Sequence, residues 1–335
     1  YTGGSNSVRG AWEPLRRAGA TARRMLISAA AEAWGVPDGE CGTREGLVVH
    51  LPTNRQRDYG SLAEAASRLP VPENVSLKKA ADFQFIGTDL TPLDALDKAQ
   101  GTAVFGSDIK LDGLLIATIV HCPVFGGSLK SIDDKKARLV AGVRHILPVD
   151  SGVAVVADNF WAADKARRLL DIEWNPGPNV RLSSASIRSE YRQAVERTAE
   201  TLDQRGESLQ ADYEVPFQAH ATMEPMCCTA HVRDGRCDLW VPTQAPTETQ
   251  QTAADYLLSV PERLLGKLRK KLGDSSLEQV QVHTTFLGGG FGRRLEQDFV
   301  AEAMQIAMLV EAPVKLIWSR EEDMQHDFYR PYTYH

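Results

Sequence analysis

Cysteine is scarce in this 335-residue sequence, and long apolar runs are missing. The five cysteines form no C-x-x-C pair, so neither a zinc ribbon nor a cysteine-ligated iron–sulfur cluster has a visible ligand set. We therefore expect the cysteines to be buried thiols. The longest strongly apolar run, residues 114–120, is far shorter than the ~20 residues that span a bilayer, which predicts that the chain has no transmembrane segment.

A strong charge of either sign is also missing. The net charge is −6, and lysine and arginine form no long block. A mildly acidic surface repels phosphate backbones, so no nucleic-acid partner is expected. Hydrophobic residues make up 43% of the chain, which is too many for a disordered protein, and the length suggests two or three domains.

The two ends lack the features of a complete gene product. No initiator methionine or signal peptide precedes Tyr1, and no capping element surrounds His335. We expect a fragment or a processed piece of a longer protein.

Hydrophobic periodicity predicts an α/β chain. Apolar residues at helical spacing predict a helix that ends at Gly35, with Pro14 near its first turn. A helix is predicted to begin at Ser131. The other predicted helices cover 160–170, 184–205, 247–260 and 296–310. The predicted strands cover 114–120, 143–149, 153–157, 171–174, 280–286 and 314–318, together with a hairpin at 227–232 and 237–241.

A glycine-rich loop, LGGGFGRR at 287–294, lies between a predicted strand and an amphipathic helix. Its glycines let the backbone approach a ligand closely, and the helix start and two arginines add positive charge. The loop is therefore an anion cradle or, equally, a tight turn with solvated arginines. A dinucleotide fingerprint fails, because Arg293 or Leu295 stands where its third glycine belongs, and no P-loop ending is present.

Two further segments suit a polar cofactor. The segment TGGSNSVRG at 2–10 precedes a helix, and its small and hydroxyl residues favour phosphate binding or, more simply, helix capping by Ser5 or Ser7. In WVPTQAP, the Gln244 amide follows a strand and can donate to an oxo or carbonyl group, or can be a surface cap.

Two acidic motifs have weaker implications. His220 and Glu224 in HATME form either acid/base machinery or a core hydrogen bond. The carboxylates at 321–323 suggest a metal, but chain neighbours seldom converge on one ion. A solvated helix start is the favoured interpretation, and no metal ligand set is predicted.

In this order, these motifs resemble the large, molybdopterin-binding subunit of isoquinoline 1-oxidoreductase and related bacterial aldehyde dehydrogenases, within the xanthine oxidase superfamily. The resemblance covers nearly the whole chain. It rests on TGGSNSVRGAWEPLRRAGATAR, GTAVFGSDIKLDGLL, HCPVFGG, GVAVVADNFWAA, AHATMEP, WVPTQAP, GGGFGRRLEQDFVAEA and PVKLIWSREEDMQHDFYRP.

The resemblance implies an α/β (α+β) fold with a hammerhead-type α/β domain and a molybdenum-binding domain. Residues 1–80 would be part of the second molybdopterin-binding domain and 81–100 a linker. Residues 101–177 would be the hammerhead domain, and 178–335 the first molybdopterin-binding domain, incomplete here.

The implied cofactor is a molybdopterin with molybdenum, in the cytosine dinucleotide form. Gln244 and Phe291 would have catalytic roles, and Glu224 would lie near the substrate channel. The positions implied to contact the cofactor are Gly3, Gly4, Ser5, Gln244, Gly289, Gly290, Phe291, Gly292 and Arg293.

The implied reaction is hydroxylation of a small-molecule substrate with oxygen from water. In relatives a glutamate base lies near the C-terminus, and no segment here matches its motif, so this chain alone is expected to be inactive. Leu295 stands where xanthine-oxidising relatives carry a glutamate, which favours an aldehyde or an N-heteroaromatic substrate over a purine.

The implied partners are a small subunit with [2Fe–2S] clusters that receives the electrons, the remaining C-terminal part of the large subunit and, in some relatives, a cytochrome c subunit. The periplasm is favoured over the cytoplasm as the location. Two other hypotheses stay open: a non-catalytic assembly or cofactor-binding module, and a nucleotide-dependent dehydrogenase that uses the glycine loop.

Overall fold

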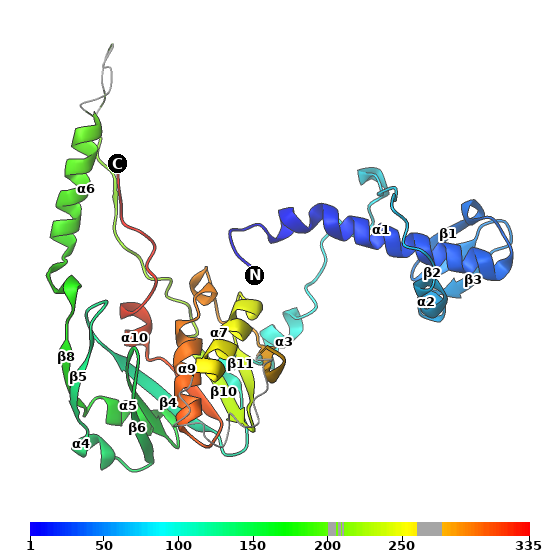
Figure 1. Cartoon of the computed structure of the whole chain (residues 1–335). Coiled ribbons are helices and arrows are strands. Elements are labelled where there is room, and N and C mark those ends of the chain that lie inside the picture. The colour runs from blue at the N-terminus through cyan, green and yellow to red at the C-terminus, as the bar shows by residue number, and fades with distance from the viewer. Residues whose placement is uncertain (200–205, 207–208, 210, 260–276) are drawn as a thin grey trace. The chain divides into compact units, whose positions relative to one another are not determined.

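The computed structural model describes residues 1–199, 206, 209, 211–259 and 277–335, which form two compact units (Figure 1). The N-terminal unit comprises Gly4–Leu96, and the main unit comprises Tyr1–Gly3 with Asp97–His335. Each unit combines helices with a sheet, so the predicted α/β fold class is confirmed. No helix in the described part of the chain is long and apolar enough to cross a membrane.

The N-terminal unit is built on a long alanine-rich helix. The helix ends as predicted at Gly35, whose φ of 66° lets its N–H reach back to Ala31 and Glu32, but Pro14 lies inside the helix rather than near its first turn. A three-stranded antiparallel sheet and a second helix pack on it around Val48 and Leu62. The elements are α1 (Ser7–Trp34), β1 (Cys41–Arg44), β2 (Leu47–His50), β3 (Arg55–Asp58) and α2 (Tyr59–Ser67).

The main unit contains one seven-stranded sheet in the order β12-β11-β10-β13-β4-β7-β6. Its pairs are antiparallel except β11 with β12 and β13 with β4, which are parallel. The strands from the predicted domains 101–177 and 178–335 therefore belong to a single sheet. Their bounds are β4 (Leu115–His121), β6 (Val143–Val149), β7 (Gly152–Ala157), β10 (Cys227–Arg233), β11 (Arg236–Val241), β12 (Val280–Thr284) and β13 (Val314–Ile317).

Helices cover both faces of this sheet, and strand β7 is buried throughout. Successive side chains of a strand point to opposite faces. Ala154 and Val156 accordingly join the core under α7 (Pro246–Ser259) and α9 (Asp298–Leu309), while Val153 and Val155 join the core under α5 (Phe160–Arg167). All five cysteines are free and buried, as predicted.

One predicted helix start is wrong. Ser131 lies in β5 (Ser128–Asp133), which pairs with β8 (Asp171–Asn175), and the short helix α4 (Lys135–Arg138) begins later. Pairing of Ile132 with Ile172 against the α5 core prevails over the local capping signal.

The remaining elements are short or lie at the edge of the described residues. The polar helix predicted at 184–205 is observed as α6 (Ser184–Ala199), and residues 200–205 lie outside the described residues, as does Val260 of the helix predicted at 247–260. The other elements are α3 (Ala95–Gln100), α10 (Arg320–Gln325) and the strand pair β9 (Glu214–Val215) with β14 (Thr333–Tyr334).

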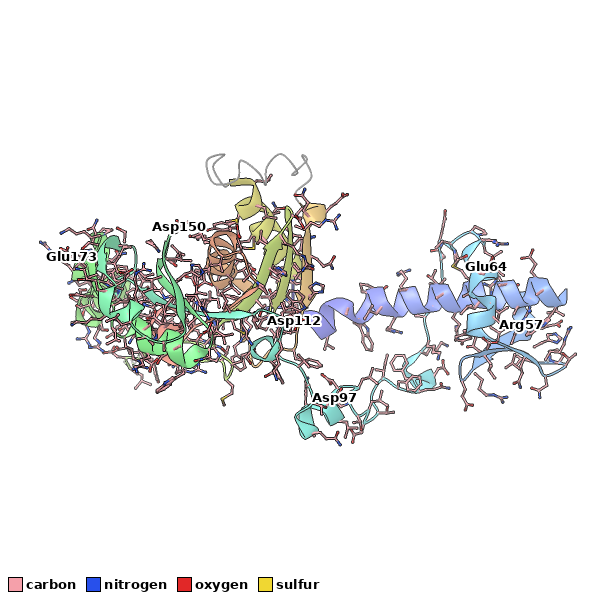
Figure 2. The ribbon with its side chains drawn as sticks, turned by 90° about the horizontal axis from the view of Figure 1, so that it is seen from below. Arg57, Glu64, Asp97, Asp112, Asp150 and Glu173 are labelled. Atoms are coloured by element: carbon pink, nitrogen blue, oxygen red, sulfur yellow. The ribbon has the colours of Figure 1, made fainter. Side chains whose placement is uncertain are left out.

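Each unit carries exposed charged side chains. Figure 2 labels Arg57 and Glu64 in the N-terminal unit and Asp112, Asp150 and Glu173 in the main unit, all of them exposed.

Candidate cofactor-binding site

The glycine loop follows β12 and leads into α9. A Cβ atom on Gly288 would lie 2.3 Å from Glu224 Cβ, so only glycine allows this close packing. Gly289 and Gly292 have φ values of 100° and 105°, and Phe291 between them has a φ of 57°. Phe291 is 65% exposed, so a large aromatic side chain is presented to solvent from a strained backbone position.

Gln244 joins this loop to the first residues of the chain. Its side-chain Oε1 accepts from the N–H of Gly292 at 3.0 Å, and its Nε2 donates to the carbonyl of Thr2 at 2.7 Å. The Gln244 backbone N–H donates to the carbonyl of Arg294 at 3.1 Å, and its carbonyl accepts from Thr2 at 2.8 Å. Gln244 is therefore a half-buried clamp rather than a surface cap, and an amide nitrogen carries a second hydrogen besides the one used by Thr2.

The segment predicted to contact the cofactor, Gly3–Ser5, contains residues of both units. A Cβ atom on Gly3 would lie 3.3 Å from the Leu295 side chain, so this residue lies beside the glycine loop. Gly4 and Ser5 belong to the N-terminal unit and both have positive φ. The alternative that Ser5 or Ser7 caps the helix is wrong, because the N-cap is Asn6 and no side-chain capping bond is present there.

Both loop arginines are buried, so the interpretation as solvated side chains is wrong. Arg293 forms a two-bond ion pair with Asp298 at 2.7 and 2.9 Å and contacts Asp327 at 3.1 Å. Burial lowers the pKa of Arg293, but these carboxylates more than compensate and raise it. Burial is the dominant effect on Arg294, whose pKa is lowered. The positive charges are committed to the protein, so any anion cradle here is formed by the backbone.

The Glu224 side chain fixes the glycine loop through hydrogen bonds. Its carboxylate accepts from Ser107 N at 2.9 Å, Gly288 N at 3.1 Å and Arg294 Nη2 at 3.1 Å. Arg294 also donates to the Glu224 carbonyl at 2.7 Å and to the Gly289 carbonyl at 2.8 Å. This buried carboxylate thus has an organising role in the structure, whereas its predicted position near a substrate channel stays a prediction.

His220 pairs with a different acid from the one expected. Its Nδ1 lies 2.9 Å from Asp327 Oδ1, so the suggested His220–Glu224 pair is wrong. Its Nε2 would lie 3.7 Å from a Cβ on Gly292 and therefore faces the glycine loop. Sequence reasoning missed Asp327 because it lies 107 residues further along the chain, beyond any local pattern.

A second ionisable cluster lies at the end of β4. His121 Nδ1 lies 2.7 Å from Glu322, and its Nε2 lies 2.7 Å from Glu302 of α9. Burial lowers the pKa of His121, but the two carboxylates outweigh it and raise the pKa to about 9. Burial, followed by the charge of His121, lowers the pKa of His326 to about 4.

The three successive carboxylates at 321–323 differ in exposure and in their partners. Glu321 is exposed, but Glu322 and Asp323 are 6% and 3% exposed, so the solvated helix start predicted for them is wrong. Glu322 faces His121, and Asp323 binds Arg320 at 2.7 Å. Both are buried because α10, capped by Ser319, packs its first turn against β4.

The backbone of the glycine loop fits a bulky polar cofactor. It has left-handed turns at Gly289 and Gly292, hydrogen bonds to Gln244 and Glu224 fix it, and it carries the exposed ring of Phe291. Residues 187–335 match the protein family described as "Molybdopterin cofactor-binding domain". The loop and its clamp thus lie in a molybdopterin-binding domain rather than in a dinucleotide-binding one.

Two curated relatives are an oxidoreductase subunit and an aldehyde dehydrogenase. The chain is 30% identical to isoquinoline 1-oxidoreductase subunit beta of Brevundimonas diminuta, over 98% of this chain and 47% of that protein. It is 30% identical to the membrane-bound aldehyde dehydrogenase [pyrroloquinoline-quinone] of Gluconacetobacter polyoxogenes, over 98% of this chain and 44% of that protein. The chain therefore spans less than half the length of each of these relatives.

A solved structure shares the fold. The aldehyde oxidoreductase from Desulfovibrio desulfuricans superposes with a TM-score of 0.53 at 17% sequence identity, over 82% of this chain and 35% of that chain. Residues 187–335 therefore match a molybdopterin cofactor-binding domain, and 98% of the chain aligns with isoquinoline 1-oxidoreductase subunit beta, so the predicted resemblance is confirmed.

Proposed function

We propose that this chain is the molybdopterin-binding part of a molybdenum hydroxylase large subunit that oxidises an aldehyde or an N-heteroaromatic ring. The observation that carries the proposal is the Gln244 clamp, which joins the glycine loop to the first residues of the chain. The matched cofactor-binding domain supplies the cofactor class, and the names of the two curated relatives quoted above supply the substrate classes.

The cofactor would be held by backbone more than by charge. We assign its contacts to the backbone at Gly289, Gly290, Phe291 and Gly292, to the second amide hydrogen of Gln244, and to the segment Gly3–Ser5. Arg293 would act as a buried support through Asp298 and Asp327, and Glu224 as a positioning residue under Gly288. The exposed Phe291 ring would border the substrate.

The bound molybdopterin, in the cytosine dinucleotide form, would supply the oxidation of an electron-poor carbon with oxygen from water. The chain's own residues keep the loop rigid and exclude water from beneath it. The base that accepts the proton would come from the remaining C-terminal part of the large subunit. Leu295, a short apolar side chain beside Gly3, offers no group to bind a purine.

The proposed assembly has further subunits. A small subunit with [2Fe–2S] clusters would take the electrons, with a cytochrome c subunit as a further acceptor and the periplasm as the location. The Brevundimonas relative is named as a subunit beta, which fits a multi-subunit enzyme. Within this chain we assign residues 1–80 to the second molybdopterin-binding domain, 81–100 to a linker, 101–177 to the hammerhead domain and 178–335 to the first molybdopterin-binding domain.

Metal analysis and turnover of the native complex test this proposal. We expect near-stoichiometric molybdenum together with iron, and oxidation of aldehydes or N-heteroaromatic compounds well above that of xanthine. The variant Gln244→Ala should lower molybdenum content, whereas Gln250→Ala, at an amide on α7 remote from the loop, should not. Molybdenum without turnover of any of these compounds would favour the assembly-module hypothesis, and native protein without molybdenum would overturn the proposal.

A further inference from the structure

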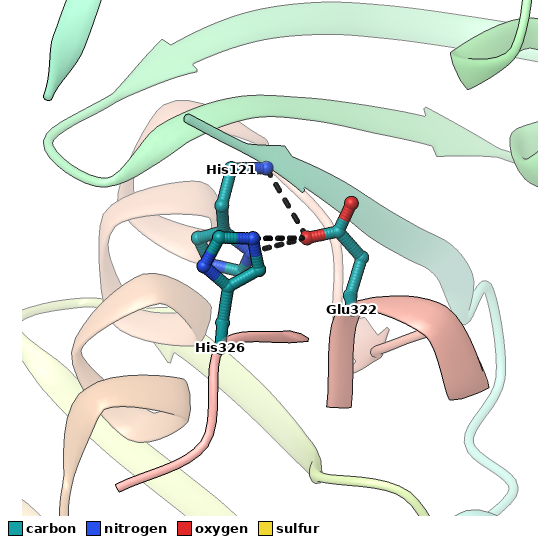
Figure 3. A group of neighbouring side chains, drawn as sticks. All are labelled: His121, Glu322 and His326. Atoms are coloured by element: carbon teal, nitrogen blue, oxygen red, sulfur yellow. Dashed lines mark hydrogen bonds and ion pairs between the residues drawn. The ribbon is translucent and has the colours of Figure 1, made fainter. Parts of the chain in front are cut away.

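Two histidines and a glutamate from distant parts of the sequence meet in the main unit (Figure 3). His121 is the last residue of β4, Glu322 lies on α10 and His326 follows that helix. Their nearest donor atoms all lie within 4.8 Å of one another. Glu322 Oε2 lies 2.7 Å from His121 Nδ1 and 3.4 Å from His326 Nε2, so one carboxylate oxygen faces both imidazoles, whose ring centroids are 4.5 Å apart.

The cluster is screened from solvent. His121 and Glu322 are 7% and 6% exposed, and the His326 side chain is 11% exposed. Two imidazoles and one carboxylate are the ligand types that suit zinc and its neighbours among the transition metals, whereas magnesium and calcium prefer oxygen alone. Metal–ligand bonds of about 2.0–2.1 Å in a tetrahedral site place two ligand atoms roughly 3.3 Å apart. The distances from Glu322 Oε2 to the two histidine nitrogens, 2.7 and 3.4 Å, lie below and above this value.

A second carboxylate, that of Glu302, gives independent support for a metal site. His121 presents its other nitrogen, Nε2, to Glu302 at 2.7 Å. Glu302 is itself fixed by Ser151 at 2.6 Å and by the indole N–H of Trp318 at 2.8 Å. A histidine that binds a metal through one nitrogen almost always donates its other N–H to such an anchored carboxylate. Glu302 therefore matches the outer partner of a metal ligand.

We propose that His121, Glu322 and His326 form a binding site for a divalent transition metal, with zinc as the best match and Glu302 as the partner that orients His121. The site is distinct from the glycine loop. On binding, the metal takes the place of the hydrogen between Glu322 and His121 Nδ1, which is released as a proton, whereas the neutral His326 ring binds through Nε2 and keeps its one hydrogen on Nδ1. It would tie the end of β4 to α10, next to Asp327, which holds Arg293 and His220.

Cobalt and zinc binding to the full chain tests the proposal. After chelation and dialysis, the wild-type chain should bind one Zn²⁺ or Co²⁺, and the Co²⁺ form should show visible absorption typical of a four-coordinate site. His326→Gln should weaken binding by at least about 100-fold, and Glu302→Gln by roughly 10–100-fold. His50→Gln is the matched control, since His50 is a buried histidine paired with Glu40 in the N-terminal unit.

A ligand exchange keeps the test valid where His326→Gln fails to fold. His326→Cys retains a ligating atom, so its Co²⁺ form should add a thiolate-to-cobalt charge-transfer band in the near ultraviolet. A wild-type chain without stoichiometric binding, equal Co²⁺ affinity in wild type and His326→Gln, or His326→Cys without the new band would each overturn the proposal. None of these measurements needs molybdenum or turnover, so they stand or fall separately from the proposed function.

Discussion

At the scale of single residues, the glycine loop depends on buried contacts that no local pattern encodes. The Glu224 carboxylate neutralises Arg294 and at the same time accepts the N–H of Gly288. The sequence pointed to Glu224, Gln244 and the glycines through the family motif. It did not predict that the arginines face inward, because the pairing of Arg293 with Asp298 and Asp327, and of Arg294 with Glu224, is recognisable only in the folded chain.

Removing the charge of Glu224 should lower the free energy of unfolding. Glu224→Gln leaves the buried Arg294 without a counter-charge, and breaking one partner of such a pair costs about 3–5 kcal/mol. Urea unfolding of the main unit checks this. The exposed i,i+4 pair Glu64–Arg68 is the control, and Glu64→Gln should leave the unfolding free energy unchanged within error. Similar effects of the two variants would contradict the organising role of Glu224.

The close approach at Gly288 gives a second prediction. In Gly288→Ala the new Cβ would meet Glu224 Cβ at 2.3 Å and Glu224 N at 3.2 Å, so the loop must move. Overpacking of this kind costs about 1–3 kcal/mol, and molybdenum content should fall as well. Gly19→Ala is the matched control in the α1 helix, where nothing lies within 4 Å of the added atom. A variant as stable and as rich in molybdenum as wild type would refute this account.

At the scale of elements, long apolar patterns were predictable and short polar ones were not. The predicted strands at 114–120, 153–157 and 314–318 correspond to β4, β7 and β13, since buried β-branched runs carry a strong signal. The strand β3 was missed because its four residues, Arg-Gln-Arg-Asp, are polar and exposed. The His121–Glu322 contact was also missed, since it joins residues 201 positions apart.

The ion pairs of α5 predict a pH dependence of stability. Burial raises the pKa of Asp164, but hydrogen bonds from Arg168 and Arg167 prevail and hold it below its ordinary value of 3.8. A lowered pKa in the folded state stabilises the fold above the unfolded value, and this contribution disappears as the pH falls below about 4.

Asp164→Asn tests this dependence. Its deficit in unfolding free energy relative to wild type should be complete at pH 6 and should shrink as the pH is lowered from 4 toward 3. The exposed Asp112 provides the control, because Asp112→Asn should have little effect at any pH. A deficit of the same size at pH 6 and pH 3 would exclude the charged form of Asp164 as its source.

At the scale of the whole molecule, each of the two units has its own apolar core. Val48 and Leu62 belong to the N-terminal core, and Leu316 belongs to the core of the main unit. The sequence predicted more than one domain. The predicted boundary at 177/178 stays a prediction. The parallel pairing of β13 with β4, which joins strands from both sides of it in one sheet, has no local signature and was not predictable.

Separate cores predict separable thermal transitions. Val48→Ala should lower the melting temperature of one calorimetric transition, and Leu316→Ala that of the other, because a cavity in a core destabilises the cooperative unit that contains it. Differential scanning calorimetry of the full chain gives the readout, with each variant serving as the control for the other. One transition that shifts equally in both variants would contradict two independent units.

The position of β4 has a consequence during synthesis on the ribosome. Its partner β7 follows within a few dozen residues, but β13 is made roughly 200 residues later. At about 5–20 residues per second, the other edge of β4 waits on the order of 10–40 s for its parallel neighbour. An apolar strand with an open edge can pair with other chains. The nascent protein therefore carries an unpaired strand edge, open to intermolecular pairing, until residues 314–317 have been synthesised.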